Sequence, residues 1–541
     1  MEEKFIAEKN FPLNIKTNSI VKLFFLILFI ASLAISNTIT IFQSSFRNTR
    51  KLQENKNYSE IIVIIDNSNN DSFINEDFFP KPYIEYLSEN EILMKWNETV
   101  ENCENMFYNS SIIQINLSNF DTSEVISIDK MFFNCTKLAN FSLSNKNFSK
   151  LQTMTEIFAN CNNLISIKLE NIDFIELTLL KDIIINCPKL VNIDFINVNF
   201  TKLNIFENAF SDIEYTNNYL NVFFKNLNLP NLITMKGIFS NCNKLKNFEF
   251  QNIFSPKILS MEEMFENCTK LTTATFLNFE APNLKSLKRI FKNCVSLKAV
   301  KLENILENVN ISQIESLEEM FSNCRNLYNY KIENVSFNEL VTMEKMFENS
   351  TSIIDAKFEN IYAPKLNSMG YMFSNCRNLK NISFINFESP NIKFTERMFN
   401  NCINLNYTKL EGILHKISFS KLESMEEMFC GCSSLNSFIL ENITFLELVN
   451  INGMLSGKHT NYYISFKNLN FPKLTSMIFL YNGGQIYDYK YCSSDYNHPD
   501  YFINFENIDL PNVLTLENSF FFILLLSTKK FKYEKYKHSK S

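Results

Sequence analysis

The stretch Leu259–Asn283, LSMEEMFENCTKLTTATFLNFEAPN, is one unit of a pattern that returns about every 26 residues through most of the 541-residue chain. Its core reads M-F-x-N-C-x-x-L-x-x-φ-x-φ-x-N-φ, where φ is an apolar residue. Ten cysteines mark the register: Cys135, Cys161, Cys187, Cys242, Cys268, Cys294, Cys324, Cys376, Cys402 and Cys432. Where the cysteine is absent, its place is taken by Ser110, Ile213, Ser350, Lys458 and Gly484. The chain is therefore a repeat protein of about 15–16 units.

The period predicts a solenoid of the leucine-rich-repeat type, because a unit of this length cannot bury its apolar face alone and must stack on its neighbours. Capping-box spacing of serine and glutamate opens several units, as in Ser260-x-x-Glu263, and predicts a short helix. The residues that follow are spaced i, i+3, i+4 and i+7, as on one helical face, and should point inward: Met261, Met264, Phe265 and Cys268.

After the cysteine the apolar residues alternate, as in Leu271, Ala274 and Phe276, which predicts a short strand. The fold class expected is an α/β solenoid, a right-handed coil with one parallel sheet on one face and short helices on the other. An asparagine ends each predicted strand. Since its amide both donates and accepts hydrogen bonds, a structural ladder between repeats is expected; its members include Asn252, Asn278, Asn304, Asn334, Asn360 and Asn386.

The solvent-facing positions of several predicted strands carry a lysine and a glutamate two residues apart. Strands in a sheet lie ~4.8 Å apart with alternate residues on the same face, so a lysine column should run beside a glutamate column. This surface reads either as a mutually neutralising solvated face or as a partner-binding face. The residues concerned are Lys301, Glu303, Lys331, Glu333, Lys357 and Glu359.

The segments that flank the repeats predict the domain organisation. The apolar run within residues 1–42 reads as a signal peptide or as a signal anchor of twenty residues, Leu23–Phe42. Residues 43–58 are polar and form a linker. Residues 59–104 lie outside the repeat register, include the only tryptophan, and are expected to cap the apolar end of the solenoid at 105–526. A basic tail, 527–541, follows.

Residues 481–501 are irregular within the solenoid, and their tyrosines and aspartates suit either a degenerate repeat or a sugar-binding surface. Tyr487, Tyr489 and Tyr491 are speculative partner-binding residues there. The same segment holds the one group that a lyase-like enzyme could use, Asp488, Asp495, His498 and Asp500. We expect no enzyme activity, because these residues form no recognised catalytic motif.

Composition excludes several kinds of site. A net charge of −6 provides no basic field for nucleic acid, and eight glycines with no phosphate-loop motif indicate no nucleotide cofactor. Four histidines and no C-x-x-C pair make a zinc site improbable. Thirteen cysteines, mostly in one column, do not define a disulfide framework. No cofactor or metal is expected, and the oligomeric state cannot be deduced.

Ile115–Leu138, INLSNFDTSEVISIDKMFFNCTKL, closely resembles the repeat of BspA-like leucine-rich-repeat surface proteins, the type abundant in mycoplasma surface lipoproteins and protist surface families. The resemblance covers about residues 105–520. It implies a cell-surface or extracellular protein that adheres to, or recognises, a protein or glycan, with membrane contact only through the N-terminal segment. A self-associating structural coat or an intracellular scaffold is the alternative. No lipoprotein-type cysteine follows the apolar run, so lipid anchoring is not expected.

Overall fold

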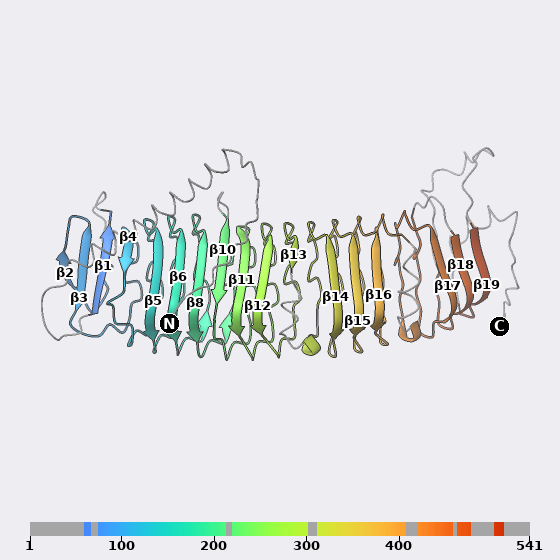
Figure 1. Cartoon of the computed structure of the whole chain (residues 1–541), viewed down its shortest axis with the longest axis horizontal. Coiled ribbons are helices and arrows are strands. Elements are labelled where there is room, and N and C mark those ends of the chain that lie inside the picture. Colours follow the sequence, from blue (N-terminus) through green and yellow to red (C-terminus); the bar gives the residue numbers. More distant parts are fainter. Residues whose placement is uncertain are drawn as a thin grey trace, which may run out of the picture. The chain divides into compact units, whose positions relative to one another are not determined.

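The computed structural model describes residues 59–66, 74–211, 219–300, 311–406, 419–457, 463–477 and 502–512 (Figure 1). All of them belong to one unit of the chain, Tyr58–Ser541. The predicted signal or anchor segment, the linker up to residue 57, the irregular segment 481–501 and the basic tail lie outside the described residues. Within the described residues, no helix is long and apolar enough to cross a membrane.

The strands of successive repeats lie side by side and pair in parallel (Figure 1). The first sheet has seven strands: β5 (Asn140–Phe148), β6 (Ser166–Phe174), β8 (Asn192–Phe200), β10 (Leu220–Lys225), β11 (Leu245–Phe254), β12 (Thr273–Glu280) and β13 (Ala299–Val300). Two further sheets have three strands each: β14 (Asn329–Ser336), β15 (Asp355–Tyr362) and β16 (Asn381–Glu388), then β17 (Ser437–Thr444), β18 (Tyr463–Asn470) and β19 (Phe502–Asp509).

A second parallel ladder links the repeats outside these sheets. It consists of the short strands β7 (Leu179–Leu180) and β9 (Ile205–Phe206) and of single bridges that run from Asn102 to Ser476. The prediction of a parallel-sheet solenoid is therefore confirmed. Parts of several of the predicted repeats, such as residues 301–310 and 407–418, lie outside the described residues.

The strands continue past the asparagine that was expected to end them. In β12, Phe276 is buried, Leu277 and Asn278 both face outward, and Phe279 is buried again. Asn278 has φ 53°, in the left-handed region, so the alternation of side chains shifts by one residue at this point. Asparagine tolerates this conformation better than most residues, which explains its presence there.

The prediction of short helices is wrong. The only helical elements among the described residues are two single turns of 3-10 helix, η2 (Ile311–Gln313) and η4 (Phe419–Lys421). Ser260 does not cap a helix: its hydroxyl accepts a hydrogen bond from the backbone N–H of Glu262, two residues on, at 3.2 Å. Glu263 and Asn267 have φ 56° and 62°, and a right-handed helix cannot contain such residues.

The backbone of this segment is instead a series of turns that hydrogen-bonds to the next repeat. The N–H groups of Glu263, Phe265 and Asn267 donate to the carbonyls of residues 288, 290 and 292 at 3.0, 2.9 and 2.8 Å. Within the segment, Glu266 and Cys268 donate three residues back, to Glu263 and Phe265. The turns bring Met261, Met264, Phe265 and Cys268 inward, and all four are fully buried. The prediction of their burial is thus confirmed, although the helix that motivated it is absent.

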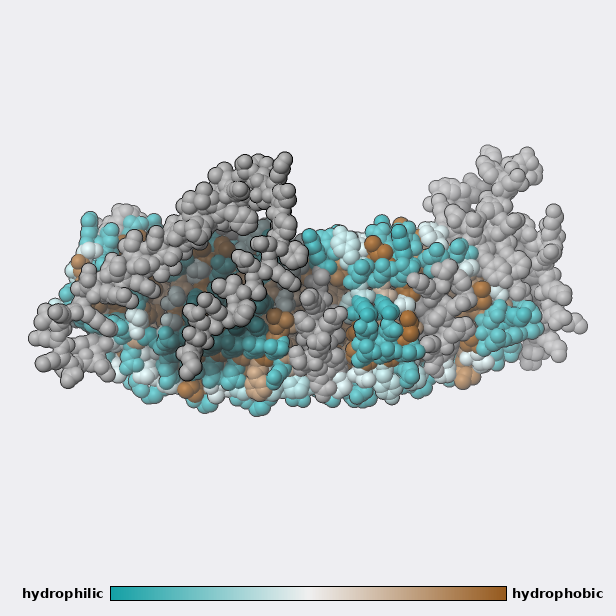
Figure 2. All heavy atoms as spheres, viewed as in Figure 1, coloured by the Kyte–Doolittle hydropathy of each residue, from teal (hydrophilic) through white to brown (hydrophobic). Residues whose placement is uncertain are grey.

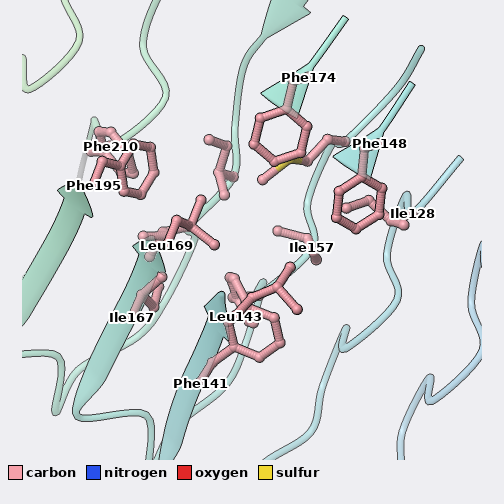
Figure 3. Close-up of a pocket in the computed structure, with 14 residues that line it drawn as sticks. Ile128, Phe141, Leu143, Phe148, Ile157, Ile167, Leu169, Phe174, Phe195 and Phe210 are labelled. Atoms are coloured by element: carbon pink, nitrogen blue, oxygen red, sulfur yellow. The ribbon is translucent and has the colours of Figure 1, made fainter. Parts of the chain in front are cut away.

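Phenylalanine rings stack through the core from repeat to repeat. Ring centroids of successive members, for example Phe239, Phe265 and Phe291, lie 5.2–5.7 Å apart. The column is interrupted at Ile184, between Phe158 and Phe210. An apolar cavity of about 20 Å³ lies beside this interruption (Figure 3). Ligand pockets measure hundreds of Å³, so this cavity is a packing defect and not a binding site.

The cysteine column consists of free thiols that donate hydrogen bonds. Cys268 Sγ donates to the carbonyl of Phe239 at 3.0 Å, and Cys376 Sγ donates to that of Phe347 at 3.0 Å. Ser350 occupies the same place and donates to Phe321 at 2.7 Å. All twelve cysteines of the described residues are free. Burial raises the pKa of the Cys135 thiol to about 12, and it also raises the pKa of the Cys268 and Cys376 thiols, so these three remain protonated donors.

The N-terminal end of the solenoid is covered by an antiparallel sheet in the order β2-β3-β1-β4. Its strands are β1 (Ser59–Ile65), β2 (Tyr83–Tyr86), β3 (Glu91–Trp96) and β4 (Ile112–Asn116). Trp96 is 2% exposed, contacts Phe120 and donates from Nε1 to the carbonyl of Pro80 at 2.8 Å. The last strand of this sheet, β4, therefore lies beyond residue 104, where the cap was expected to end.

Candidate functional site

The solvent-facing side of the parallel sheets carries regular columns of side chains. In register, Lys331 lies opposite Lys357, and Glu333 lies opposite Glu359. The columns stop at β16, where Ser383 and Ile385 occupy the two positions. The register brings these four of the six sequence-predicted lysines and glutamates together. Lys301 and Glu303 lie outside the described residues, as do Tyr487, Tyr489 and Tyr491.

Each lysine pairs with the glutamate of its own strand. Lys331 lies 2.5 Å from Glu333, Lys168 lies 2.7 Å from Glu170, and Lys357 pairs with Glu359 in the same way. The hydrogen bond from Lys357 lowers the pKa of Glu359. Exposed ion pairs of this kind contribute little to stability. They do neutralise one another, so this part of the face offers hydrogen-bonding groups more than net charge.

The strand asparagines are joined by amide hydrogen bonds that run along the solenoid. Asn278 Nδ2 donates to Asn252 Oδ1, and Asn252 Nδ2 donates to Asn226 Oδ1, both at 2.8 Å. Asn360 donates to Asn334 at 2.7 Å and Asn386 to Asn360 at 2.8 Å, while Asn304 lies outside the described residues. These side chains are solvent-exposed, so they bond to one another and not to buried backbone.

Two further amide ladders were missed in the sequence. The asparagine of the Asn-Cys pair forms one, in which Asn267 donates to Asn241 at 2.7 Å and Asn293 donates to Asn267 at 2.6 Å. The other lies near the start of β8, β10 and β11, where Asn221 donates to Asn192 at 3.3 Å and Asn247 donates to Asn221 at 2.8 Å. The signal is present in the sequence, because asparagine before cysteine recurs throughout, and the structure places this asparagine at a left-handed turn position.

A compact ion cluster lies on the face formed by the turns. Glu319 accepts hydrogen bonds from Arg289 and, at 2.6 Å, from Lys292, and its side chain is only 11% exposed. Burial alone would raise the pKa of Glu319, but the hydrogen bonds from Lys292 and Arg289 outweigh it and lower the pKa. The opposite charges satisfy one another. We therefore assign this cluster to stability.

No group of histidine, cysteine, aspartate and glutamate side chains suited to hold a metal ion occurs in the described part of the chain. The described surface visible in Figure 2 is mostly hydrophilic, with scattered apolar residues. The exposed apolar side chains include Phe223, Phe254 and Tyr362 on the sheet face. Extended columns of this kind suit contact with a large partner, because such a partner can touch several repeats at once.

The parallel pairing, the turns and the stacked core together define a repeat protein of the parallel β-solenoid class. The chain belongs to the family described as "Mycoplasma protein of unknown function, DUF285", whose model matches residues 83–194, 203–316, 233–360, 295–413 and 405–495. No curated protein matches the chain.

Solved structures with some similarity have low sequence identity to this chain. An internalin from Listeria monocytogenes is 14% identical, with 54% of this chain and 78% of the internalin covered and a TM-score of 0.18. A leucine-rich-repeat protein of Leptospira interrogans is 11% identical, with 59% and 88% covered and a TM-score of 0.18. A complex of TLR13 with ssRNA13 is 13% identical, with 72% and 56% covered and a TM-score of 0.14.

Proposed function

We propose that this chain is a cell-surface or secreted repeat protein that recognises a protein or glycan partner through the solvent-facing side of its parallel sheets. The observation that carries the proposal is the in-register presentation of Lys331, Glu333, Lys357 and Glu359 on neighbouring strands. Solenoids of stacked repeats generally provide extended binding surfaces of this kind. The apolar run at residues 23–42 and the resemblance of the repeat to BspA-like surface proteins support the location.

A binding experiment tests the recognition part. The full chain is applied to arrays of proteins and glycans, beside a variant with Lys331→Ser and Lys357→Ser. Serine is a conservative choice because Ser383 occupies the same column in β16. The matched control is Lys202→Ser with Lys365→Ser, since these lysines are also exposed and also pair with glutamates, Glu176 and Glu339. Partners bound by the chain and the control, but lost in the first variant, support the sheet face.

The location is tested separately. Intact cells that produce the chain are labelled with a membrane-impermeant reagent, and the mature N-terminus is determined. Labelling from outside and either cleavage within residues 34–42 or retention of an anchor support the proposal. A chain that is inaccessible from outside and keeps an unprocessed N-terminus contradicts it, and an intracellular scaffold replaces it. Concentration-dependent self-association without any bound partner would instead indicate a structural coat.

A further inference from the structure

On the described part of the sheet face, two acidic side chains flank an exposed aromatic ring that has no cation over it. Phe223 of β10 is 39% exposed and points outward. In register, Asp194 of β8 lies beside it on one side and Glu249 of β11 on the other. Neighbouring strands are ~4.8 Å apart, so both carboxylates stand next to the ring. We call Asp194, Phe223 and Glu249 the Phe223 patch.

The acids of the Phe223 patch differ from the other acids of the face. Glu170, Glu333 and Glu359 each hold a lysine of their own strand. Within the described part of the chain, the side chains of Asp194 and Glu249 form no ion pair and no hydrogen bond. Asp194 is also half-buried, and its burial raises its pKa while Lys168 opposes this effect. A partly desolvated, uncompensated carboxylate gains more from an incoming cation than one that is already paired.

Two tyrosine rings of the described residues, Tyr219 and Tyr371, show how a cation can cover an aromatic face. Lys246 lies over Tyr219 at 4.3 Å, and Tyr371 is approached by Lys345 at 5.3 Å and by Arg397 at 5.5 Å. Cations are attracted to aromatic faces by the ring quadrupole. Among the described residues, no cation lies over Phe223. The face of the Phe223 ring is therefore open to a cation from outside the described residues.

The chemistry that fits the Phe223 patch is a guanidinium group. Arginine stacks its planar group on an aromatic face and directs its N–H donors outward to carboxylates, which lysine cannot do at the same time. We propose that the Phe223 patch binds an arginine side chain of a partner protein. This inference rests on the proposed function and deepens it, because it selects a protein partner over a glycan and states the chemistry of the contact.

Two basic residues lie near the patch. Lys168 of β6 is in register with Asp194, on the side away from Phe223, and pairs with Glu170. Lys225 lies on the same strand as the ring. It follows Phe223 by two residues on the same face and lies between Ile196 and Gln251. Its charge opposes an incoming arginine. Lys225→Gln is therefore expected to strengthen arginine binding, which an unspecific loss of fold would not do.

The test uses the full chain and a fluorescein-labelled octa-arginine peptide, with octa-lysine and octa-glutamate as comparison probes. The net charge of −6 attracts any polycation, so the variants must separate the patch from the general field. Asp194→Asn with Glu249→Gln and the control Glu441→Gln with Glu506→Gln both remove two negative charges from the same face, and the control residues flank Lys467 in register. Phe223→Ser removes the ring and introduces serine, which occupies the corresponding outward strand position at Ser142 and Ser383.

The expected results are distinct for each variant. Asp194→Asn with Glu249→Gln weakens octa-arginine binding at least tenfold, and the control double variant weakens it less than twofold. Phe223→Ser weakens octa-arginine binding at least fivefold and octa-lysine binding less, while Lys225→Gln strengthens the former two- to threefold. Circular dichroism and the melting temperature verify that each variant is folded.

Three outcomes overturn the inference: equal losses in the two double variants, an unchanged affinity in Phe223→Ser, or no octa-arginine binding by the unaltered chain. None of these results contradicts the proposed function, which depends on array partners lost with Lys331 and Lys357. Conversely, if no array partner depends on Lys331 and Lys357 while octa-arginine binding behaves as expected, the proposed function fails and the arginine-binding result does not.

Discussion

Asn252 allows the two roles of the strand asparagines to be separated. Its amide donates to Asn226 and accepts from Asn278, both at 2.8 Å, and its backbone has φ 56°. Asn247, five residues earlier in β11, also donates to a neighbouring asparagine, Asn221, and accepts from Thr273 at 2.9 Å. Asn247 does not have a positive φ. The two residues therefore share the hydrogen bonds and differ in the backbone.

The expected losses of unfolding free energy follow from these contacts. Asn247→Ala removes these two side-chain hydrogen bonds and a longer one from Thr272 at 3.3 Å, which cost about 1 kcal/mol together. Asn252→Ala removes two similar bonds and places alanine in the left-handed region, so the cost rises to about 2–3 kcal/mol. Asn252→Gly avoids that strain but adds flexibility to the unfolded chain, for about 1.5–2 kcal/mol.

Urea unfolding of the three variants and the unaltered chain measures these differences. Stacked repeats can unfold in parts, so tyrosine fluorescence and circular dichroism must give coincident transitions before free energies are compared. Equal losses for Asn247→Ala and Asn252→Ala would refute the backbone role of Asn252. An unchanged stability of Asn247→Ala would refute the contribution of the amide ladder.

Three further predictions concern the core and the turn face. In urea unfolding, Cys376→Ser should lower the unfolding free energy by less than about 1 kcal/mol, because serine already occupies this column at Ser350. Cys376→Ala loses the hydrogen bond to Phe347 and should lower it by about 1–2 kcal/mol. The reverse order would contradict the donor role of the thiol. Ile184→Phe should fill the cavity beside Ile184, continue the ring column and raise the unfolding free energy by about 0.5–1 kcal/mol. The control Leu164→Phe is at a fully buried position that does not line the cavity, and it should lower the unfolding free energy by about 1–3 kcal/mol. Glu319→Gln should lower the unfolding free energy by about 1–2 kcal/mol at pH 7. Because the folded state lowers the pKa of Glu319, this difference should be present above about pH 4.3 and vanish as the pH falls through the lowered pKa. A constant difference from pH 7 to pH 3 would show that the charge of Glu319 is not involved.

Much of the solenoid could be predicted from the repeat alone. The register of Met264, Phe265, Cys268, Leu271 and Phe276 identified buried positions, and all five are fully buried. Alternation after the cysteine predicted the strands and their parallel stacking. The error at Ser260–Cys268 arose because inward residues at i, i+3, i+4 and i+7 fit a chain of tight turns as well as a helix. Only the left-handed backbone at Glu263 and Asn267 distinguishes them.

The candidate binding surface was only partly predictable. The alternation placed Lys331 and Glu333 on one face, but it could not show that they pair within their own strand. Nor could it distinguish Asp194 and Glu249 from the paired acids, since that difference depends on which residues of neighbouring repeats lie in register. Insertions of a few residues between repeats change this neighbourhood without changing the local pattern.

The sequence by itself determined that this chain stacks its repeats, because each unit carries an apolar set too small to form a core alone. It also determined which side chains face inward, since burial follows the local periodicity. The tertiary structure decided the backbone between the strands, the three amide ladders and the exposed Phe223 between two unpaired acids. These features depend on hydrogen bonds and charges between residues about 26 or more positions apart, which only the stacking brings together.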